Sequence, residues 1–307
     1  MTKPTFAVAA IMKDEGPYLI EWIAWHRMLG IKNFVIADNG SSDGMTEILI
    51  RLDSLGIVKR VPYPATVKPG TNFQANCYSE ILDSERSKFD WIFFIDADEF
   101  IFIDNIPAGI GHFLQDIPDD IGALALNWKT FGSSGKVEAQ NGLTLSRFTK
   151  RARESRQASH IYKTLVRSKA AKPTIKNPHH VDIKDSFRRA AGDLSNFIPT
   201  DGKGFKTKEC IWTGMHIRHY VVRSYAEYWH KKARRGVPTT NSKARDDQFF
   251  KIHDLNDIDD PIPASILNQL DQEIQVLKMK LTGIAQEIID VDLTISEIPA
   301  PNTNSTT

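Results

Sequence analysis

The sequence predicts a mixed, mostly parallel α/β sheet flanked by helices, with a long amphipathic helix near the C-terminus. Over residues 6–102, short apolar runs alternate with segments of helical spacing, which is the pattern of a parallel sheet. The apolar run at 89–95 ends abruptly in carboxylates, as a buried strand does at a ligand-binding edge. From Ile262 to Ile288, apolar residues recur every three or four positions, which indicates one long amphipathic helix.

The first half of the chain supplies the alternation of strands and helices. A strand over 6–12 is followed by Lys13-Asp14-Glu15-Gly16-Pro17, where proline and acidic residues suit the first turn of a helix. That helix continues to Gly30, which suits its C-terminal cap. Asp38 follows the next apolar run and begins a loop rich in turn-forming residues. Further strands are predicted at 34–37, 57–61 and 89–95, and further helices at 45–55 and 72–88.

After residue 102 the regular alternation stops. Strands are predicted at 124–128, 162–167 and 215–220, with a glycine-containing loop at 131–135 and a helix that closes at Gly236. The final residues are polar and are expected to be disordered. We therefore expect an α/β domain over 1–240, a helical extension over 241–298 and a disordered tail over 299–307.

Composition narrows the class of protein. The 307 residues carry a formal net charge of +1, so bulk electrostatic attraction to nucleic acid is not expected. The two cysteines, Cys77 and Cys210, stand in unrelated contexts and imply neither a disulfide framework nor a metal site. The sequence shows no signal-peptide pattern and no apolar window long enough to span a membrane. A cytosolic protein is expected.

The carboxylates after the 89–95 run predict a divalent-metal site. Asp96 and Asp98 would lie where an open α/β sheet forms a binding crevice. Oxygen ligands so close together repel unless a cation lies between them, and they suit Mg²⁺ or Mn²⁺, which could hold a diphosphate. Two other Asp-x-Asp sequences, at 257–259 and 290–292, do not follow a predicted buried strand, and no metal site is predicted there. The alternative is a strand end capped by solvated acids.

Several motifs together resemble glycosyltransferase family 2-like proteins of the GT-A fold, in the branch related to family 92. The resemblance runs in the expected order from about residue 5 to about residue 240 and excludes the tail helix. The matching segments are Lys13-Asp14-Glu15, Glu21-Trp22-Ile23-Ala24-Trp25-His26, Leu29-Gly30-Ile31, Asp38-Asn39-Gly40-Ser41-Ser42-Asp43, Gln74 with Asn76, Asp96-Ala97-Asp98-Glu99-Phe100, Trp128 with Phe131-Gly132-Ser133, His179-His180, and His219-Tyr220 leading to Lys232, Arg234, Arg235 and Gly236.

This resemblance implies a Rossmann-like, GT-A-type fold and transfer of a sugar from a nucleotide-activated donor. It implies a base and ribose pocket lined by Asp14, Glu15 and Asp38. Asp96 would contact the ribose or the metal, and Asp98 would hold the metal against both phosphates. His219 is the first choice for an additional histidine ligand, and His179 is a second. The remaining donor-binding candidates are Gln74, Asn76, Ala97, Lys232 and Arg235. A UDP-sugar with Mn²⁺ or Mg²⁺ is favoured.

The chemistry of transfer suggests further roles. The leaving diphosphate gains charge, which a divalent ion and the cations at 231–235 would stabilise. These cations are expected to close over the phosphates as a lid. The acceptor hydroxyl needs a base, for which Asp182 is the first choice; Glu154, Asp185 and Asp193 are alternatives. Direct displacement would invert the anomeric configuration. Acceptor contacts are expected from Trp128, stacking on a sugar, and from Phe131.

Two other functions stay open at this stage. A nucleotidyltransferase also uses carboxylates and a divalent ion, but its first loop is usually basic and glycine-rich, whereas residues 13–17 are acidic. A non-catalytic sugar-binding or scaffold subunit is the second alternative. The expected acceptor is a glycan or a lipid-linked glycan of a surface polysaccharide, with the protein at the inner face of the membrane as one location. The tail helix could pack on its own domain or form a homodimer.

Overall fold

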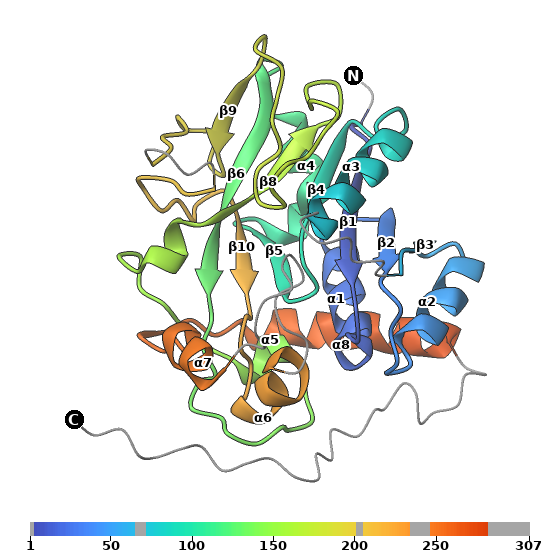
Figure 1. Ribbon diagram of the computed structural model, residues 1–307, viewed down its shortest axis with the longest axis vertical. Helices are drawn as coiled ribbons and strands as arrows, with labels where there is room; N and C mark the ends of the chain where they lie inside the picture. The colour runs from blue at the N-terminus through green and yellow to red at the C-terminus, as the bar shows by residue number, and fades with distance from the viewer. Residues whose placement is uncertain (1–2, 65–71, 201–204, 234–245, 282–307) are drawn as a thin grey trace.

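A nine-stranded sheet forms the centre of the computed structural model, which describes residues 3–64, 72–200, 205–233 and 246–281. The strand order is β3-β2-β1-β4-β8-β6-β10-β5, and β9 pairs with β6 (Figure 1). The strands are β1 (Phe6–Met12), β2 (Phe34–Asp38), β3 (Lys59–Pro62), β4 (Trp91–Phe94), β5 (Glu99–Ile103), β6 (Ile121–Thr130), β8 (Tyr162–Arg167), β9 (Arg188–Ala191) and β10 (Met215–His219).

The first half is the predicted parallel sheet. β1 is parallel to both β2 and β4, and β2 is parallel to β3. Alternate residues of β1 face opposite sides: Val8 belongs to the core packed against α1 (Gly16–Met28) and α2 (Met45–Ser54). Ala9 belongs to the core packed against α3 (Phe73–Glu85). Burial on both faces explains why these strands are apolar at nearly every position.

Antiparallel pairing enters the sheet around β8 and β5. β8 lies between β4 and β6 and is antiparallel to both, and β5 is antiparallel to β10. Five of the eight pairings in this sheet are parallel, so the predicted mixed, mostly parallel sheet is confirmed. The apolar residues after Asp98 form β5, which lies at the far end of the sheet from β3. Residues 95–98 therefore connect two strands that are not neighbours.

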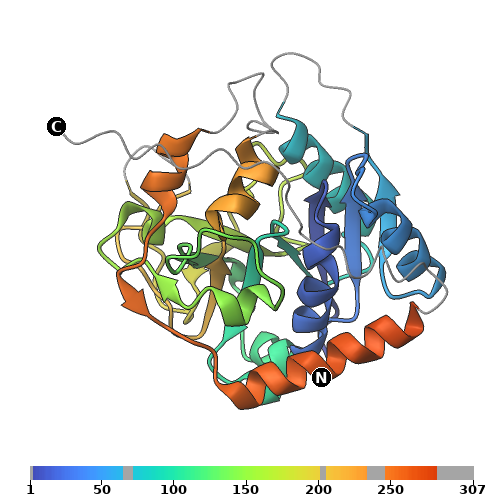
Figure 2. The same ribbon diagram turned by 90° about the horizontal axis from the view of Figure 1, so that it is seen from below.

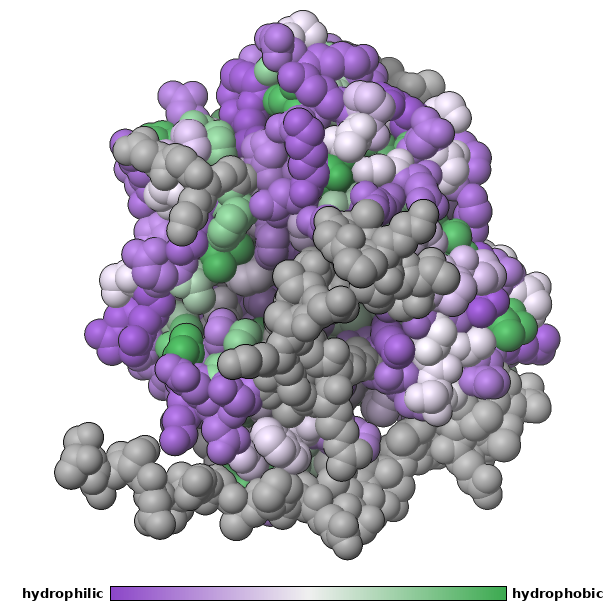
Figure 3. Space-filling model, viewed as in Figure 1, coloured by the Kyte–Doolittle hydropathy of each residue, from purple (hydrophilic) through white to green (hydrophobic). Residues whose placement is uncertain are grey.

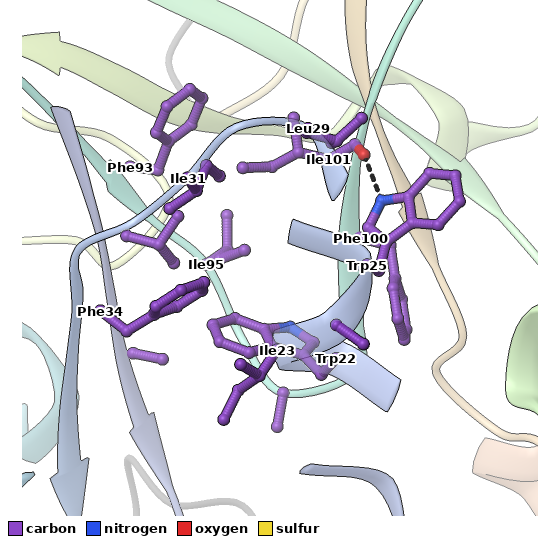
Figure 4. Close-up of a cluster of buried hydrophobic side chains, with 14 of the residues drawn as sticks. Trp22, Ile23, Trp25, Leu29, Ile31, Phe34, Phe93, Ile95, Phe100 and Ile101 are labelled. Carbon is purple, nitrogen blue, oxygen red and sulfur yellow. Dashed lines mark hydrogen bonds between the residues drawn. The ribbon is translucent and has the colours of Figure 1, made fainter. Parts of the chain in front are cut away.

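Tryptophans of α1 fix that helix to β5. The indole Nε1 of Trp25 donates to the carbonyl of Ile101 at 2.7 Å, within a cluster of buried aromatic and aliphatic side chains (Figure 4). Trp22 donates in the same way to the carbonyl of Glu99 at 2.8 Å. Both rings are buried, so their N–H groups need these partners. The start of β5, which follows the carboxylates directly, is thereby held in place.

The predicted C-terminal helix is confirmed as α8 (Ala264–Lys280); the part of the prediction beyond residue 281 lies outside the described residues. Figures 1 and 2 show α8 crossing α1, against which it packs. Leu270, Ile274 and Leu277 are buried, and Arg27 of α1 pairs with Glu273 at 2.5 Å. In this protein the helix therefore covers its own domain.

The remaining elements are short and lie on the periphery. They are α4 (Gly109–Gln115), α5 (Thr144–Arg147), α6 (Tyr225–Tyr228), a π-helix (Trp229–Ala233), α7 (Asp247–His253), two 3-10 helices (Ile106–Ala108 and Gln157–His160) and a small sheet of β7 (Lys150–Arg151) with β11 (Ile258–Asp259). The region expected to be a helical extension thus also contains β11, which pairs with β7 of the preceding domain. The expected tail at 299–307 lies outside the described residues.

No helix in the described ranges is both long and apolar enough to cross a membrane. On the face shown in Figure 3, hydrophobic side chains are scattered among hydrophilic ones. Among the described residues, the large exposed hydrophobic side chains are Ile50 and Leu55 in and at the end of α2, together with Val137, Ile198, Ile252, Ile258 and Met279.

Candidate active site

Asp98 and His219 meet beside the carboxyl end of β4. Glu99, the first residue of β5, is the register partner of His219, the last residue of β10. The backbone N–H of Tyr220 donates to the carbonyl of Asp98 at 2.8 Å. Asp98 Oδ1 then lies 3.5 Å from His219 Nε2, and both side chains are more than nine-tenths buried. The structure therefore brings together the two first-choice metal ligands, which are 121 positions apart in the chain.

Asp96 is held by three side chains from other elements. Its Oδ2 lies 2.9 Å from the ammonium of Lys163 in β8. Its Oδ1 accepts hydrogen bonds from Gln74 Nε2 at 2.6 Å and from Tyr78 OH at 3.2 Å, both in α3. Gln74 was a predicted site residue, whereas Lys163 and Tyr78 were missed. A lysine in a predicted strand that also carries Tyr162, Leu165 and Val166 was the one available signal for Lys163.

Glu99 completes this buried charge cluster. Its side chain accepts a hydrogen bond from the backbone N–H of Asp96 at 2.8 Å and lies 3.6 Å from Lys163. Burial raises the pKa of Glu99 well above its ordinary value, and the charge of Lys163 opposes that shift. Burial would lower the pKa of Lys163, but the charges of Asp96 and Glu99 outweigh it and raise the pKa. The ammonium therefore stays charged.

Trp128 stands between the two candidate histidines. Its ring centroid lies 4.0 Å from that of His219 and 5.2 Å from that of His179. Burial and the charge of Lys163 lower the pKa of His179 to about 3, so the ring is neutral, which is the form that binds metals. Its Nδ1 is buried without a hydrogen-bond partner among the described residues. Trp128 is partly exposed and can contact a ligand at this site.

The site can now be set beside known proteins. The model of Glycosyltransferase family 92 matches residues 5–260. The chain belongs to glycosyltransferase family 92. A family 92 protein of Oryza sativa subsp. japonica is 27% identical over 191 residues, covering 60% of this chain and 30% of that protein. One of Arabidopsis thaliana is 24% identical over 251 residues, covering 76% and 40%. The chain thus spans well under half the length of these curated relatives.

Similarity to solved structures is weak. A crystal structure of S. aureus TarS has a TM-score of 0.36 and 11% identity, covering 92% of this chain and 76% of that one. Glucosyl-3-phosphoglycerate synthase from Mycobacterium tuberculosis has a TM-score of 0.28 and 16% identity, covering 41% and 44%. At these scores, neither likeness adds to the argument about this family 92 protein.

The loop after β1 is hydrogen-bonded to the loop after β2 through Asp14. Glu15, in the same loop, is buried and does not line an open pocket. Asp14 accepts a hydrogen bond from the backbone N–H of Ser42 at 2.7 Å. Glu15 is buried in an ion pair with Lys231, and Arg223 Nη1 lies 3.6 Å from its Oε2. Lys231, expected to close over the phosphates, is thus tied to the first loop. Arg223 was not among the predicted site residues. Its backbone has a positive φ of 58°, which is uncommon for arginine, so the sequence gave no reason to expect this conformation.

Asp38 also has protein partners. The guanidinium of Arg60 donates to Asp38 Oδ2 from Nε at 3.0 Å and from Nη2 at 2.8 Å, and Thr46 donates to the same oxygen at 2.9 Å. The carboxylate is 1% exposed. The structure therefore gives Asp38 a role in holding β2 to β3 and α2, and its expected contact with a nucleotide remains untested.

Other donor-binding candidates fall in three different places. Asn76 is exposed on α3, and Ala97 packs into the hydrophobic core between the two aspartates. Lys232 lies in the π-helix, and Arg235 lies outside the described residues.

Phe131 corrects one expectation. Its side chain is fully buried and stacks on Tyr220 at 4.7 Å between centroids, with the guanidinium of Arg218 at 5.0 Å. A ring enclosed in this way cannot offer a face to an acceptor sugar. Phe131 instead packs in the hydrophobic core, because its backbone N–H donates to the carbonyl of His219 at 2.8 Å and keeps the residue beside β10.

Two of the four base candidates, Asp182 and Glu154, have their neighbours outside the Asp96 cluster. Asp182 pairs with His180 at 3.3 Å, and His180 Nδ1 contacts the hydroxyl of Tyr162 at 2.5 Å. Tyr162 and Lys163 are successive residues of β8 and face opposite sides, so Asp182 lies across the strand from Lys163. Glu154 is exposed and near Cys210. Among the described residues, neither carboxylate forms a hydrogen bond or ion pair with Asp96, Asp98 or His219, and their catalytic role remains a prediction.

Proposed function

We propose that this family 92 protein transfers a sugar from a nucleotide-sugar, with UDP as the favoured nucleotide, to an acceptor hydroxyl with inversion at the anomeric carbon. The observation that carries the proposal is the pairing of Asp98 with His219 beside Asp96, at the edge where α/β sheets bind ligands. Membership of a glycosyltransferase family supports the reaction class. The acidic first loop disfavours a nucleotidyltransferase.

The residues present suit a divalent ion only in part. Asp98 and His219 offer one carboxylate and one imidazole, which accept Mn²⁺ and, less readily, Mg²⁺. Among the described residues there is no group of three or more His, Cys, Asp or Glu side chains that could enclose an ion. A bound ion would therefore need diphosphate oxygens and water to complete its coordination, which is how Mg²⁺ commonly binds with nucleotides.

In this scheme each protein group has a stated task. Asp98 and His219 would hold the ion, which would supply Lewis-acid stabilisation of the leaving diphosphate. Asp96, oriented by Gln74 and Tyr78, accepts hydrogen bonds from the donor's hydroxyl groups. Trp128 presents a partly exposed ring on which a sugar can stack. Asp182 is the proposed base.

The chemical identity of the acceptor is also proposed from the site. We favour a glycan or lipid-linked glycan, because a partly exposed tryptophan beside the ion-binding pair suits a sugar ring. With such an acceptor, we propose that the protein is cytosolic and associates peripherally with the inner face of a membrane.

Thermal shift with UDP, GDP and CDP, each with and without Mn²⁺, tests the donor assignment. A ligand that binds only the folded state at a hundredfold excess over Kd stabilises it by about 2.7 kcal/mol. We expect a Mn²⁺-dependent shift with UDP that disappears in Asp98→Asn. Asp259→Asn is the matched control, because Asp259 is the second aspartate of another Asp-x-Asp sequence and is exposed at the end of β11, so its loss should leave the shift unchanged.

Turnover separates the three candidate functions. Hydrolysis of one member of a UDP-sugar panel, lost in Asp98→Asn, supports the transferase. Release of pyrophosphate from a nucleoside triphosphate and a sugar phosphate would indicate the nucleotidyltransferase instead. A UDP shift that Asp98→Asn leaves intact would refute the role given to Asp98, and sugar binding without turnover would favour the scaffold.

A further inference from the structure

Lys163 places a fully buried cation inside the Asp-x-Asp site. Its side chain is 1% exposed and projects from β8 toward Asp96, 2.9 Å away, and Glu99, 3.6 Å away. Burying an ammonium group is costly unless carboxylates compensate it. The two contacts supply that compensation, and Asp98 adds a further attractive charge. The lysine is therefore an integral part of the site's charge balance.

The contacts of Asp96 differ from those expected of a metal ligand. One carboxylate oxygen faces the Lys163 ammonium, and the other accepts hydrogen bonds from Gln74 and Tyr78. A cation supplied by the protein thus occupies the position beside Asp96 that a metal ion would otherwise take. Asp98 has a different neighbour, the imidazole of His219. The two aspartates of the motif are consequently in unlike electrostatic surroundings.

We propose that Lys163 is a positioning residue that reserves Asp96 for the donor and makes metal binding depend on the nucleotide. Its charge repels a divalent ion at Asp98 and His219 until a diphosphate arrives to neutralise the site. The inference rests on the proposed function and adds an order of binding to it. A merely structural lysine would not have this effect, because its loss could only weaken the binding of the ion.

Binding of Mn²⁺ in the absence of nucleotide, measured by the electron paramagnetic resonance of the free ion, tests the proposal. Lys163→Gln removes the charge but keeps a donor for Asp96, so we expect the dissociation constant for Mn²⁺ to fall at least about tenfold. Lys163→Arg keeps the charge and should bind Mn²⁺ like the wild type. Lys129→Met is the matched control, because Lys129 is also a largely buried lysine paired with an aspartate, at 3.1 Å from Asp260. It should change Mn²⁺ affinity less than about twofold.

The wild type supplies a second test that needs no variant. UDP should tighten Mn²⁺ binding at least about tenfold, because the diphosphate offsets the lysine charge. Equal Mn²⁺ affinity with and without bound UDP would overturn the proposal, and so would a folded Lys163→Gln protein that binds Mn²⁺ no more tightly than the wild type. If no nucleotide binds the wild type under any condition, the proposed function fails. The nucleotide-free comparison of Lys163→Gln with Lys129→Met then still decides the electrostatic role of Lys163.

Discussion

Loss of the Arg147 charge should destabilise the fold strongly, because Arg147 and Glu227 form a buried, bidentate ion pair. Nη1 and Nη2 of Arg147 donate to the two carboxylate oxygens at 2.9 and 2.8 Å, and the side chains are 7% and 1% exposed. Arg147→Met keeps the apolar stem but removes the charged partner, so that the carboxylate keeps the hydroxyls of Tyr18 and Ser224 and the backbone N–H of Ser224 as donors. Removing one partner of a buried pair destabilises by about 3–5 kcal/mol, and we expect a loss of about 3 kcal/mol at pH 7.

The pH dependence gives this prediction a second component. Burial raises the pKa of Glu227, but the hydrogen bonds and charge of Arg147 outweigh it and lower the pKa. A carboxylate with a depressed pKa stabilises the fold above its unfolded pKa, and that contribution is lost as pH falls through the folded value. The difference between wild type and Arg147→Met should therefore be full at pH 7 and shrink as the pH falls below about 4.5.

Urea unfolding at pH 7 and at acidic pH measures both components. Arg153→Met is the control, since the pair of Arg153 with Asp257 leaves the arginine 58% exposed; it should change stability by less than about 1 kcal/mol. The double variant Arg147→Met/Glu227→Gln should lose less than the sum of its single variants, because neither charge is left unpaired. A loss below about 1 kcal/mol for Arg147→Met at pH 7 would refute this reasoning.

Two further predictions concern the tail helix and the base. Leu277→Ala should destabilise by about 2–5 kcal/mol because Leu277 is fully buried, whereas Met279→Ala, at a 62% exposed position, should change stability by less than about 0.5 kcal/mol. Unfolding at several protein concentrations checks this: a concentration-dependent loss would contradict packing of α8 on its own domain. Asp182→Asn should lower kcat by about 10²–10⁴-fold with unchanged affinity for UDP, and Glu154→Gln should not. Steady-state kinetics and calorimetry test that pair; equal kcat in Asp182→Asn and wild type would exclude Asp182 as the base.

The sequence was sufficient for the features that depend on local pattern. The apolar runs of β1, β2 and β4 identify parallel strands because both faces of such strands are buried, and the spacing of Leu270, Ile274 and Leu277 identifies α8 because a helix repeats every 3.6 residues. Asp98 could be placed at a strand end from its position alone. His219 was paired with Asp98 through the resemblance, and the register of β5 with β10 agrees with that pairing.

Tertiary structure decided which side chains share the site. Lys163 and Tyr162 are adjacent in the chain, yet only the pairing of β8 with β4 and β6 determines that Lys163 faces Asp96 and Tyr162 faces His180. A shift of one residue in that register would exchange the two. Phe131 follows the same rule, since its burial depends on β10 lying beside β6. Local pattern shows that a residue lies on a strand, but contacts between distant strands set the direction of its side chain and therefore its chemical role.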